Sequence, residues 1–216
     1  MLLGVKLQLC LWISADALTV RGPLSTSNAL LKKGAHPRGA ALSMSGMWGS
    51  GLEFGKGLFT RYRGFDAFMA PFPDEDREMY PEMFRLPDGV YEVALERPLG
   101  IAFEERDDGR GVVVDYLVEG GNAEASGVIQ SGDILIATTA VKVIGAKWEV
   151  RLIPVLELGF DTIMSAIGSN EPKWLQPVNG KYLVYLQFQR PKDADPEEVK
   201  RHLEFFTPPS DSSWVR

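Results

Sequence analysis

The stretch Arg97-Pro98-Leu99-Gly100-Ile101-Ala102-Phe103 places a glycine turn directly before an alternating apolar run. Another alternating run ends near Leu95, so the turn joins two predicted strands. A turn hinged on Gly100 can aim successive main-chain N–H groups at one point, and such a nest binds anions, most commonly a peptide C-terminal carboxylate. Arg97 adds a cationic donor at the lip of the turn. The stretch therefore predicts an anion site whose following strand can pair with an incoming peptide.

Further pieces follow this turn in a fixed order. A β-rich run, Val112–Leu117, comes first, and a Gly-rich turn with a short alanine helix, Gly120-Gly121-Asn122-Ala123-Glu124-Ala125-Ser126-Gly127, comes next. A Gly132-Asp133 turn then leads into the apolar run Ile134-Leu135-Ile136. Residues 160–167 share an apolar face at helical spacing, and residues 182–188 alternate as a last strand. With these pieces in this order, residues 90–188 resemble a PDZ domain.

The resemblance implies a mainly β fold with two short helices (α+β), built as a partly open β-barrel or sandwich over residues 90–190. It also implies a peptide groove between the strand that begins at Ile101 and the helix at residues 160–167. The peptide-binding residues would then be Arg97, Leu99, Gly100, Ile101, Ala102, Phe103, Phe160, Ile163, Met164 and Ile167.

Phe160 stands at the first helix position, where the family often has a histidine that selects a hydroxyl two residues before the end of the ligand. The side chain of Phe160 has no hydrogen-bonding group for a ligand hydroxyl at that position. The resemblance thus implies a ligand that is apolar at that position and at its last residue, the latter held by Leu99, Ile101, Phe103 and Ile167. The alternative is that Phe160 packs into the core and the groove is occluded.

The chain departs from the usual PDZ pattern in two connections. Residues 133–160 include an insertion around Trp148, which could line the groove or close it, and residues 169–180 lengthen the loop before the last strand. The run Ile136-Ala137-Thr138-Thr139-Ala140-Val141 is also similar to plant and algal thylakoid proteins that join a PDZ domain to tetratricopeptide repeats and assist photosystem II assembly. About 28 residues follow Phe188, fewer than the roughly 34 that one such repeat needs.

The N-terminal region has the composition of two targeting segments in tandem. Residues 1–17 resemble a signal peptide, and residues 18–43 are basic, serine-containing and free of acidic residues, as in a transit peptide. This pair resembles the bipartite presequence of algae with a secondarily acquired plastid, which predicts a plastid protein on the stromal side of the thylakoid. The alternative is an ordinary secreted protein with a disordered basic linker.

Charge narrows the possible partners. The net charge is −6, and loss of residues 1–43, with five basic residues and one acidic residue, would make it −10. A chain with this negative net charge is not expected to have nucleic acid or anionic lipid as its main partner. After residue 17 no run approaches the roughly 18 apolar residues of a membrane span, so we expect a peripheral protein.

Residues 44–89 form an aromatic and Gly-rich extension with an acidic linker at residues 74–78. Several of its apolar residues recur at spacings of four and three, which aligns them on one helical face. This face could dock a partner or a membrane interface, through Leu58, Phe59, Tyr62, Phe65, Met69 and Phe72. The alternative is that it folds back and covers apolar surface of its own domain.

Residues 191–216 read as a C-terminal helix followed by a tail. With a single cysteine, Cys10, and two histidines, His36 and His202, the chain offers no Cys/His metal site and no thiol or serine triad. No catalytic residue, metal or cofactor is therefore expected. The sequence favours a non-enzymatic module that binds a thylakoid membrane protein during photosystem assembly or stabilisation. The alternative is a stoichiometric structural subunit of a photosystem or antenna complex whose groove is unused.

Overall fold

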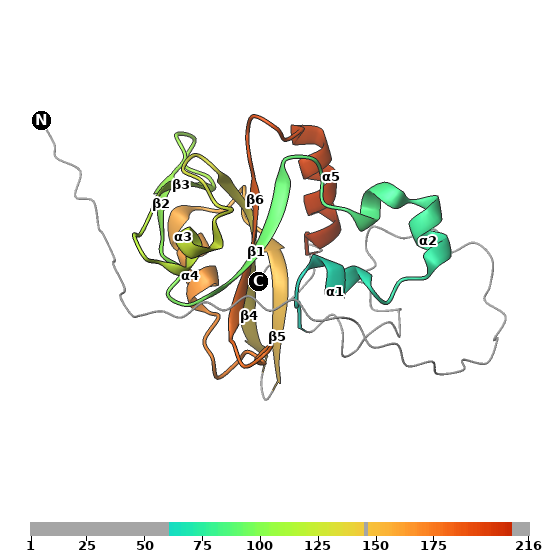
Figure 1. Cartoon of the computed structure of the whole chain (residues 1–216), viewed down its shortest axis with the longest axis horizontal. Helices are drawn as coiled ribbons and strands as arrows, with labels where there is room; N and C mark the ends of the chain where they lie inside the picture. The colour runs from blue at the N-terminus through green and yellow to red at the C-terminus, as the bar shows by residue number, and fades with distance from the viewer. Residues whose placement is uncertain (1–60, 145–146, 209–216) are drawn as a thin grey trace, which may run out of the picture.

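Six strands form one antiparallel sheet in the computed structural model, which describes residues 61–208 except residues 145 and 146 (Figure 1). The strand order is β1-β6-β4-β3-β2, and β5 pairs with β4. The strands are β1 (Val90–Glu96), β2 (Ile101–Glu105), β3 (Val112–Leu117), β4 (Ile134–Ile144), β5 (Lys147–Pro154) and β6 (Leu183–Gln189). The helices are α1 (Phe65–Met69), α2 (Asp74–Met79), η1 (Pro81–Phe84), α3 (Asn122–Ser126), α4 (Phe160–Gly168) and α5 (Pro196–Phe206). This confirms the predicted mainly β fold with short helices.

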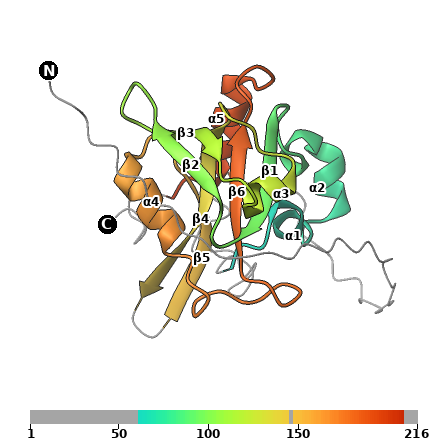
Figure 2. The ribbon, with the colours of Figure 1, turned by 60° about the vertical axis from the view of Figure 1, so that its left-hand side comes forward.

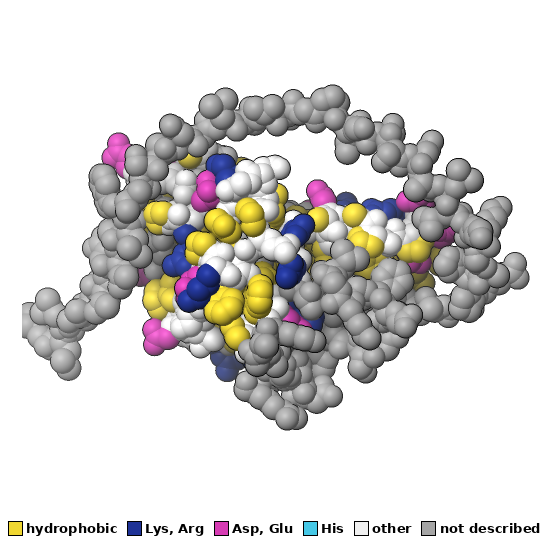
Figure 3. Space-filling view, turned by 90° about the horizontal axis from the view of Figure 1, so that it is seen from below, with side chains coloured by type: hydrophobic (Ala, Val, Ile, Leu, Met, Phe, Trp, Pro, Cys, Tyr) yellow, Lys and Arg dark blue, Asp and Glu magenta, His cyan; other side chains and the backbone are white. Residues whose placement is uncertain are grey.

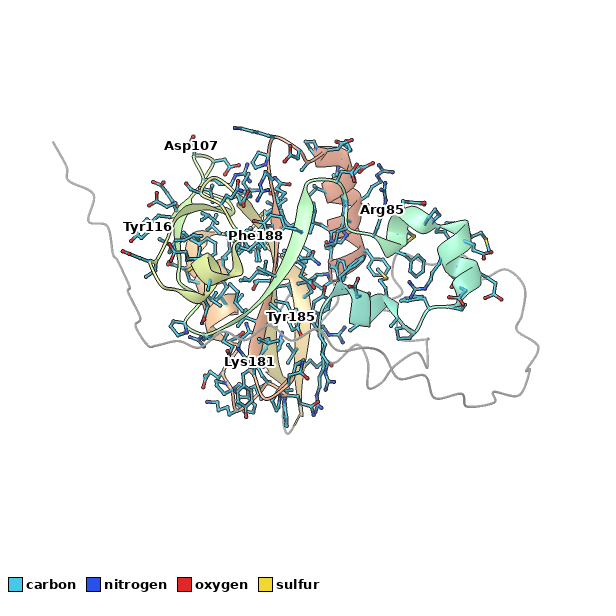
Figure 4. All side chains as sticks on the ribbon, in the orientation of Figure 1. Arg85, Asp107, Tyr116, Lys181, Tyr185 and Phe188 are labelled. Atoms are coloured by element: carbon cyan, nitrogen blue, oxygen red, sulfur yellow. The ribbon has the colours of Figure 1, made fainter. Side chains whose placement is uncertain are left out.

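β6 lies inside the sheet between β1 and β4 and is buried on both faces. Its alternating side chains Val184, Leu186 and Phe188 are fully buried on one face, while Tyr185 and Gln187 are buried on the other. Figure 4 labels Tyr185 and Phe188 along this strand. A strand with apolar side chains on both faces needs a packed layer on each side of the sheet, because only a covering layer removes the apolar surface of that face from water.

The sheet therefore separates two cores. The core that we call the groove-side core holds α3 and α4, with Ala123, Ile163 and Ile167 among its buried residues. The core that we call the strap-side core holds α1 and α5, with Phe65, Phe68, Leu203 and Phe206. Figure 1 shows α3 and α4 on one side of the sheet and α1 and α5 on the other, and Figure 2 shows β2 beside β3.

The aromatic extension folds back onto its own domain. Tyr62, Phe65 and Met69 are each less than a tenth exposed and pack against α5 and the sheet, and Phe72 packs partly buried beside them. This corrects the docking role expected for Tyr62, Phe65 and Met69, because their side chains already cover the apolar face of the sheet. Leu58 and Phe59 lie outside the described residues.

The acidic linker is a helix. Residues 74–79 form α2, with Asp74, Glu75 and Asp76 in its first turn, where negative side chains interact favourably with the helix dipole. None of its residues is buried, so α2 reaches away from the sheet while η1 returns the chain to β1.

One buried carboxylate attaches the extension to the sheet. Glu92 of β1 accepts hydrogen bonds from the Tyr62 hydroxyl at 2.5 Å, the Phe65 amide at 2.8 Å and the Gln187 side-chain amide at 3.0 Å. Burial raises the pKa of Glu92, and these donors offset part of that shift. Residues 61–69 are thus held by directed polar contacts as well as by apolar packing.

A substitution at Phe206 tests whether α5 and the extension fold together with the sheet. It is fully buried, and its ring centroid lies 5.5 Å from that of Phe68 and 6.2 Å from that of Tyr62. Phe206→Ala should lower the free energy of unfolding in urea by about 3–5 kcal/mol because it leaves a cavity. Met79→Ala, at a 63% exposed side chain of α2, is the control and should change it by less than about 0.5 kcal/mol. Similar values for the two variants would show that α5 is not part of the cooperative unit.

His202 of α5 gives the fold a pH dependence. Its Nε2 lies 2.8 Å from Oε1 of Gln187, whose amide nitrogen already donates to Glu92, so His202 donates. Burial lowers the pKa of His202 from 6.5 to about 4. The unfolded chain therefore binds a proton before the folded chain does as pH falls, and the stability contributed by neutral His202 is lost from about pH 6.5 downwards.

His202→Gln should remove this dependence while keeping an N–H donor toward Gln187. Between about pH 7 and pH 5 the unmodified protein should lose about 1–2 kcal/mol more unfolding free energy than the variant, measured by urea denaturation at both pH values. Glu92 has a raised pKa and so contributes with the opposite sign, but it is present in both proteins and cancels. Parallel losses in the two proteins would refute the assignment to His202.

Candidate functional site

The loop between β1 and β2 lies against the turn that precedes α3. The carbonyl of Leu99 accepts a hydrogen bond from the Ala123 amide at 2.9 Å, and the carbonyl of Gly100 accepts one from Val118 at 2.9 Å. Gly100 has φ of +74°, and a Cβ atom there would lie 3.0 Å from Cα of Gly121. Both the backbone conformation and the close approach of two main chains therefore require glycine.

Asn122, the first residue of α3, fixes the loop from the other side. Its Nδ2 donates to the carbonyl of Glu96 at 3.0 Å and to that of Pro98 at 2.9 Å. Sequence reasoning placed Asn122 in the Gly-rich run but gave it no role. Asparagine directly after two glycines often forms side-chain hydrogen bonds to nearby backbone groups. This feature of the sequence could have identified the role of Asn122.

The carbonyls of this loop point to α3 and its turn, while two of its amides remain available. Among the described residues, the N–H groups of Leu99 and Gly100 donate no hydrogen bond to the protein. Adjacent main-chain amides with no protein partner, around a residue of positive φ, are the elements of an anion-binding nest. The loop can therefore accept a carboxylate through main-chain donors.

Arg97 has a different partner from the one expected. Its Nη1 donates to the carbonyl of Gly168 at 3.1 Å and lies 3.5 Å from that of Asn170. These carbonyls stand at the C-terminal end of α4, where a cation is favoured by the helix dipole. In this structure Arg97 links the loop to the end of α4, and so holds together two of the three parts of the expected groove.

β2 supplies the second part of the groove. It is the last strand in the sheet order and pairs with β3, so within the part of the chain that the structure describes its other edge has no strand partner. Ile101 and Phe103 are partly buried and pack against the groove-side core, while Ala102, between them, points to the opposite face of the strand. An extended peptide added at this edge would be hydrogen-bonded to the main chain of β2.

α4 supplies the third part. Phe160 and Met164 are partly buried, pack against the groove-side core and keep some accessible surface, while Ile167 is 7% exposed. Ile163 is fully buried, which corrects its expected place in the groove: its side chain points into the core, about one helical turn from Phe160. Leu99, Ile101 and Phe103 contact the same core, so the structure brings together the loop, β2 and α4 residues that the sequence selected.

The two insertions pack away from this groove. Residues of the first lengthen β4 and β5 into a hairpin paired from Ala137–Pro154 to Ile144–Lys147, and β5 contacts α5 on the strap side. In the second, Asn170 donates to the carbonyl of Thr139 at 2.6 Å, and Trp174 packs on Trp148 of β5 at 5.6 Å between ring centroids. Both insertions therefore thicken the β4–β5 side of the molecule.

The Gly132-Asp133 turn is held by an ion pair between buried Asp133 and partly exposed Arg190. Asp133 is 2% exposed and lies 3.1 Å from Nε of Arg190, and it accepts hydrogen bonds from the Gln130 amide and the Tyr91 hydroxyl. Burial and the adjacent carboxylate raise the pKa of Tyr91. The motif's aspartate is therefore structural, and it joins β1, β4 and the residue that follows β6.

Gly100→Ala tests the fit of the loop to the turn before α3. We expect the variant to lose about 2–3 kcal/mol of unfolding free energy, because alanine adds backbone strain and a contact with Gly121. Gly109→Ala is a matched control, since Gly109 has φ of +72° but nothing within 4 Å of a Cβ atom. It should lose only about 1 kcal/mol in the same denaturation experiment. Equal losses would mean that backbone strain alone matters and that the loop is free to move off Gly121.

No family model matches the chain. It is 41% identical over 52 residues to a protein of Arabidopsis thaliana whose name describes it as chloroplastic, a match that covers 24% of this chain and 15% of the relative. It is 28% identical over 127 residues to "MAGUK p55 subfamily member 4" of Mus musculus, which covers 58% of this chain and 18% of the relative. The matches thus cover less than a fifth of the length of each relative.

The described residues contain neither a membrane-spanning helix nor a cluster of metal ligands. Within residues 61–208, apart from 145 and 146, no helix is long and apolar enough to cross a bilayer. The same residues contain no group of three or more His, Cys, Asp or Glu side chains placed to hold a metal ion.

Proposed function

We propose that the protein is a non-enzymatic PDZ-like interaction module that binds the C-terminal segment of a partner protein between β2 and α4. The observation that supports this most directly is the position of three features at one site. The edge of β2, which has no strand partner within the described part of the chain, can add a strand. The amides of Leu99 and Gly100 can bind a terminal carboxylate, and Phe160 and Met164 of α4 form an apolar wall.

The cellular setting is part of the same proposal. The composition of residues 1–43 and the similarity to a chloroplastic protein both favour a plastid. We place the module on the stromal side of the thylakoid, where the partner would be a thylakoid membrane protein in photosystem assembly or stabilisation. Leu58 and Phe59, outside the described residues, remain proposed partner-docking residues.

The chemistry of the groove defines the ligand. Leu99, Ile101, Phe103 and Ile167 would surround the last residue of the ligand, and Phe160 would contact the residue two positions before it. Neither place offers a hydroxyl or amide side chain to a polar ligand group, and an unpaired polar group would lose hydration without replacement. The ligand is therefore apolar at both positions, with a free C-terminal carboxylate.

Fluorescence polarisation with labelled ten-residue peptides tests this proposal. The panel consists of C-terminal segments of thylakoid membrane proteins with valine at the last and third-last positions, each made as a free acid and as a C-terminal amide. The free acid should bind at least about tenfold more tightly, since the amide loses the charge-assisted bonds to Leu99 and Gly100. Binding that does not distinguish acid from amide would contradict the proposed nest.

Phe160→His tests the second position, because the family resemblance assigns hydroxyl selection to a histidine there. The unmodified protein should prefer valine to threonine at the third-last ligand residue, and the variant should reverse the preference by about five- to tenfold. Met79→His, on the exposed surface of α2, is the matched control and should keep the original preference. If no peptide of the panel binds, the groove is unused, which favours a structural subunit of a photosystem or antenna complex.

A further inference from the structure

A pocket of about 250 Å³ lies between the extension and α5, on the strap side of the sheet. Its apolar wall consists of Met69 from α1, Met83 from η1, and Phe205 and Phe206 from α5. Figure 1 shows the extension beside α5, and Figure 3, which views the molecule from below, shows hydrophobic side chains bordered by acidic and basic ones where the extension lies. The pocket is separated from the proposed peptide groove by the sheet.

The wall of this pocket suits an aromatic side chain. Rings pack well against other rings, and the flexible thioethers of Met69 and Met83 adapt to a ring and contact it favourably. An apolar cavity of about 150 Å³ already binds benzene. The larger pocket beside α5 therefore has room for an indole.

The rim of the pocket carries charges of both signs. Arg85 and Arg201 lie there with Glu82 and Glu198, so the rim has no net charge. The ion pairs of the two arginines are long, 3.8 Å from Arg85 to Asp88 and 4.0 Å from Arg201 to Glu198. A guanidinium that is held this loosely can lie on the face of an aromatic ring.

The chain itself supplies an aromatic side chain directly after α5. Residues 209–216, which lie outside the described residues, read Pro-Ser-Asp-Ser-Ser-Trp-Val-Arg. Trp214 thus follows a run of polar residues, and burial of its indole would be favourable. Asp211 and Arg216 give the segment one charge of each sign, which matches the mixed charges of the rim.

The length of this segment allows it to reach the pocket. From Pro208 to Trp214 the chain can span about 20 Å when extended. The pocket borders α5 from Glu198 to Phe206, which is about 12 Å of helix. Because a short flexible link gives an effective concentration in about the millimolar range, an anchor of only millimolar affinity would be docked for much of the time.

We propose that residues 209–216 fold back along α5 and that the indole of Trp214 occupies this pocket. The segment then completes the layer that the extension and α5 form on the strap side, with its polar residues in water and its one large aromatic side chain removed from it. The inference is independent of the peptide groove, because it involves the opposite face of the sheet.

Disulfide trapping in the full chain tests this docking. In a Cys10→Ser background, which removes the single native cysteine, Val215→Cys places a thiol beside Trp214. The second thiol is introduced on the pocket face of α5, as Glu198→Cys or as Arg201→Cys. The matched control is Lys200→Cys, an exposed position on the same helix that lies about 200° further round it than Glu198. All three sites can be reached from residue 208, so only docking distinguishes them.

The protein is oxidised mildly at low concentration, and the intramolecular disulfide is measured by mass spectrometry after alkylation of the free thiols. We expect the faster of the two pocket-side pairs to form its disulfide at least about tenfold faster than the Lys200→Cys pair, because a disulfide needs Cα atoms within about 7 Å. Adding Trp214→Ser should bring these rates within about twofold of each other.

Three results would overturn the proposal. Equal rates in the presence of Trp214, or a faster reaction at position 200, would show that the segment does not lie at the pocket. A preference for the pocket face that survives Trp214→Ser would show that the indole is not what occupies it. A disulfide-linked dimer in place of the intramolecular product would make a second copy of the chain the occupant.

Discussion

The burial of β6 on both faces is the constraint that shapes this molecule. A strand with apolar side chains on one face and Tyr185 with Gln187 on the other cannot be covered by a single helical layer. α3 and α4 cover one face, and α1 with α5 cover the other. Residues 61–89, before β1, and helix α5, after β6, therefore cover the strap-side face of the sheet, which would otherwise meet water.

The polar groups of the strap-side core follow from the same arrangement. Gln187 points into a layer otherwise made of aromatic and aliphatic side chains, and it is satisfied by Glu92, Tyr62 and His202. Because a buried amide or carboxylate without partners is costly, this set defines how the extension and α5 can lie on the sheet. Apolar packing alone would allow many arrangements of the aromatic rings.

The groove-side and strap-side faces of the sheet carry different features. The groove-side core carries the elements of the candidate peptide site, with Asn122 and Arg97 fixing the loop to α3 and α4. The strap-side face is occupied by the chain itself.

The sequence by itself determined the order of β1, β2, β3, α3, β4, α4, β6 and α5 and the glycine turn at Gly100, because these depend on local spacing and composition. It did not indicate that residues 74–79 form α2 or that residues 147–154 form β5. Helical periodicity alone placed Phe160, Ile163, Met164 and Ile167 on one side of α4. Only the tertiary structure decided that Ile163 faces the core, that Arg97 binds the end of α4, and that Tyr62, Phe65 and Met69 cover their own sheet. An amphipathic face looks the same in sequence whether its cover is a partner or the rest of the chain, since the hydrophobic effect has no direction.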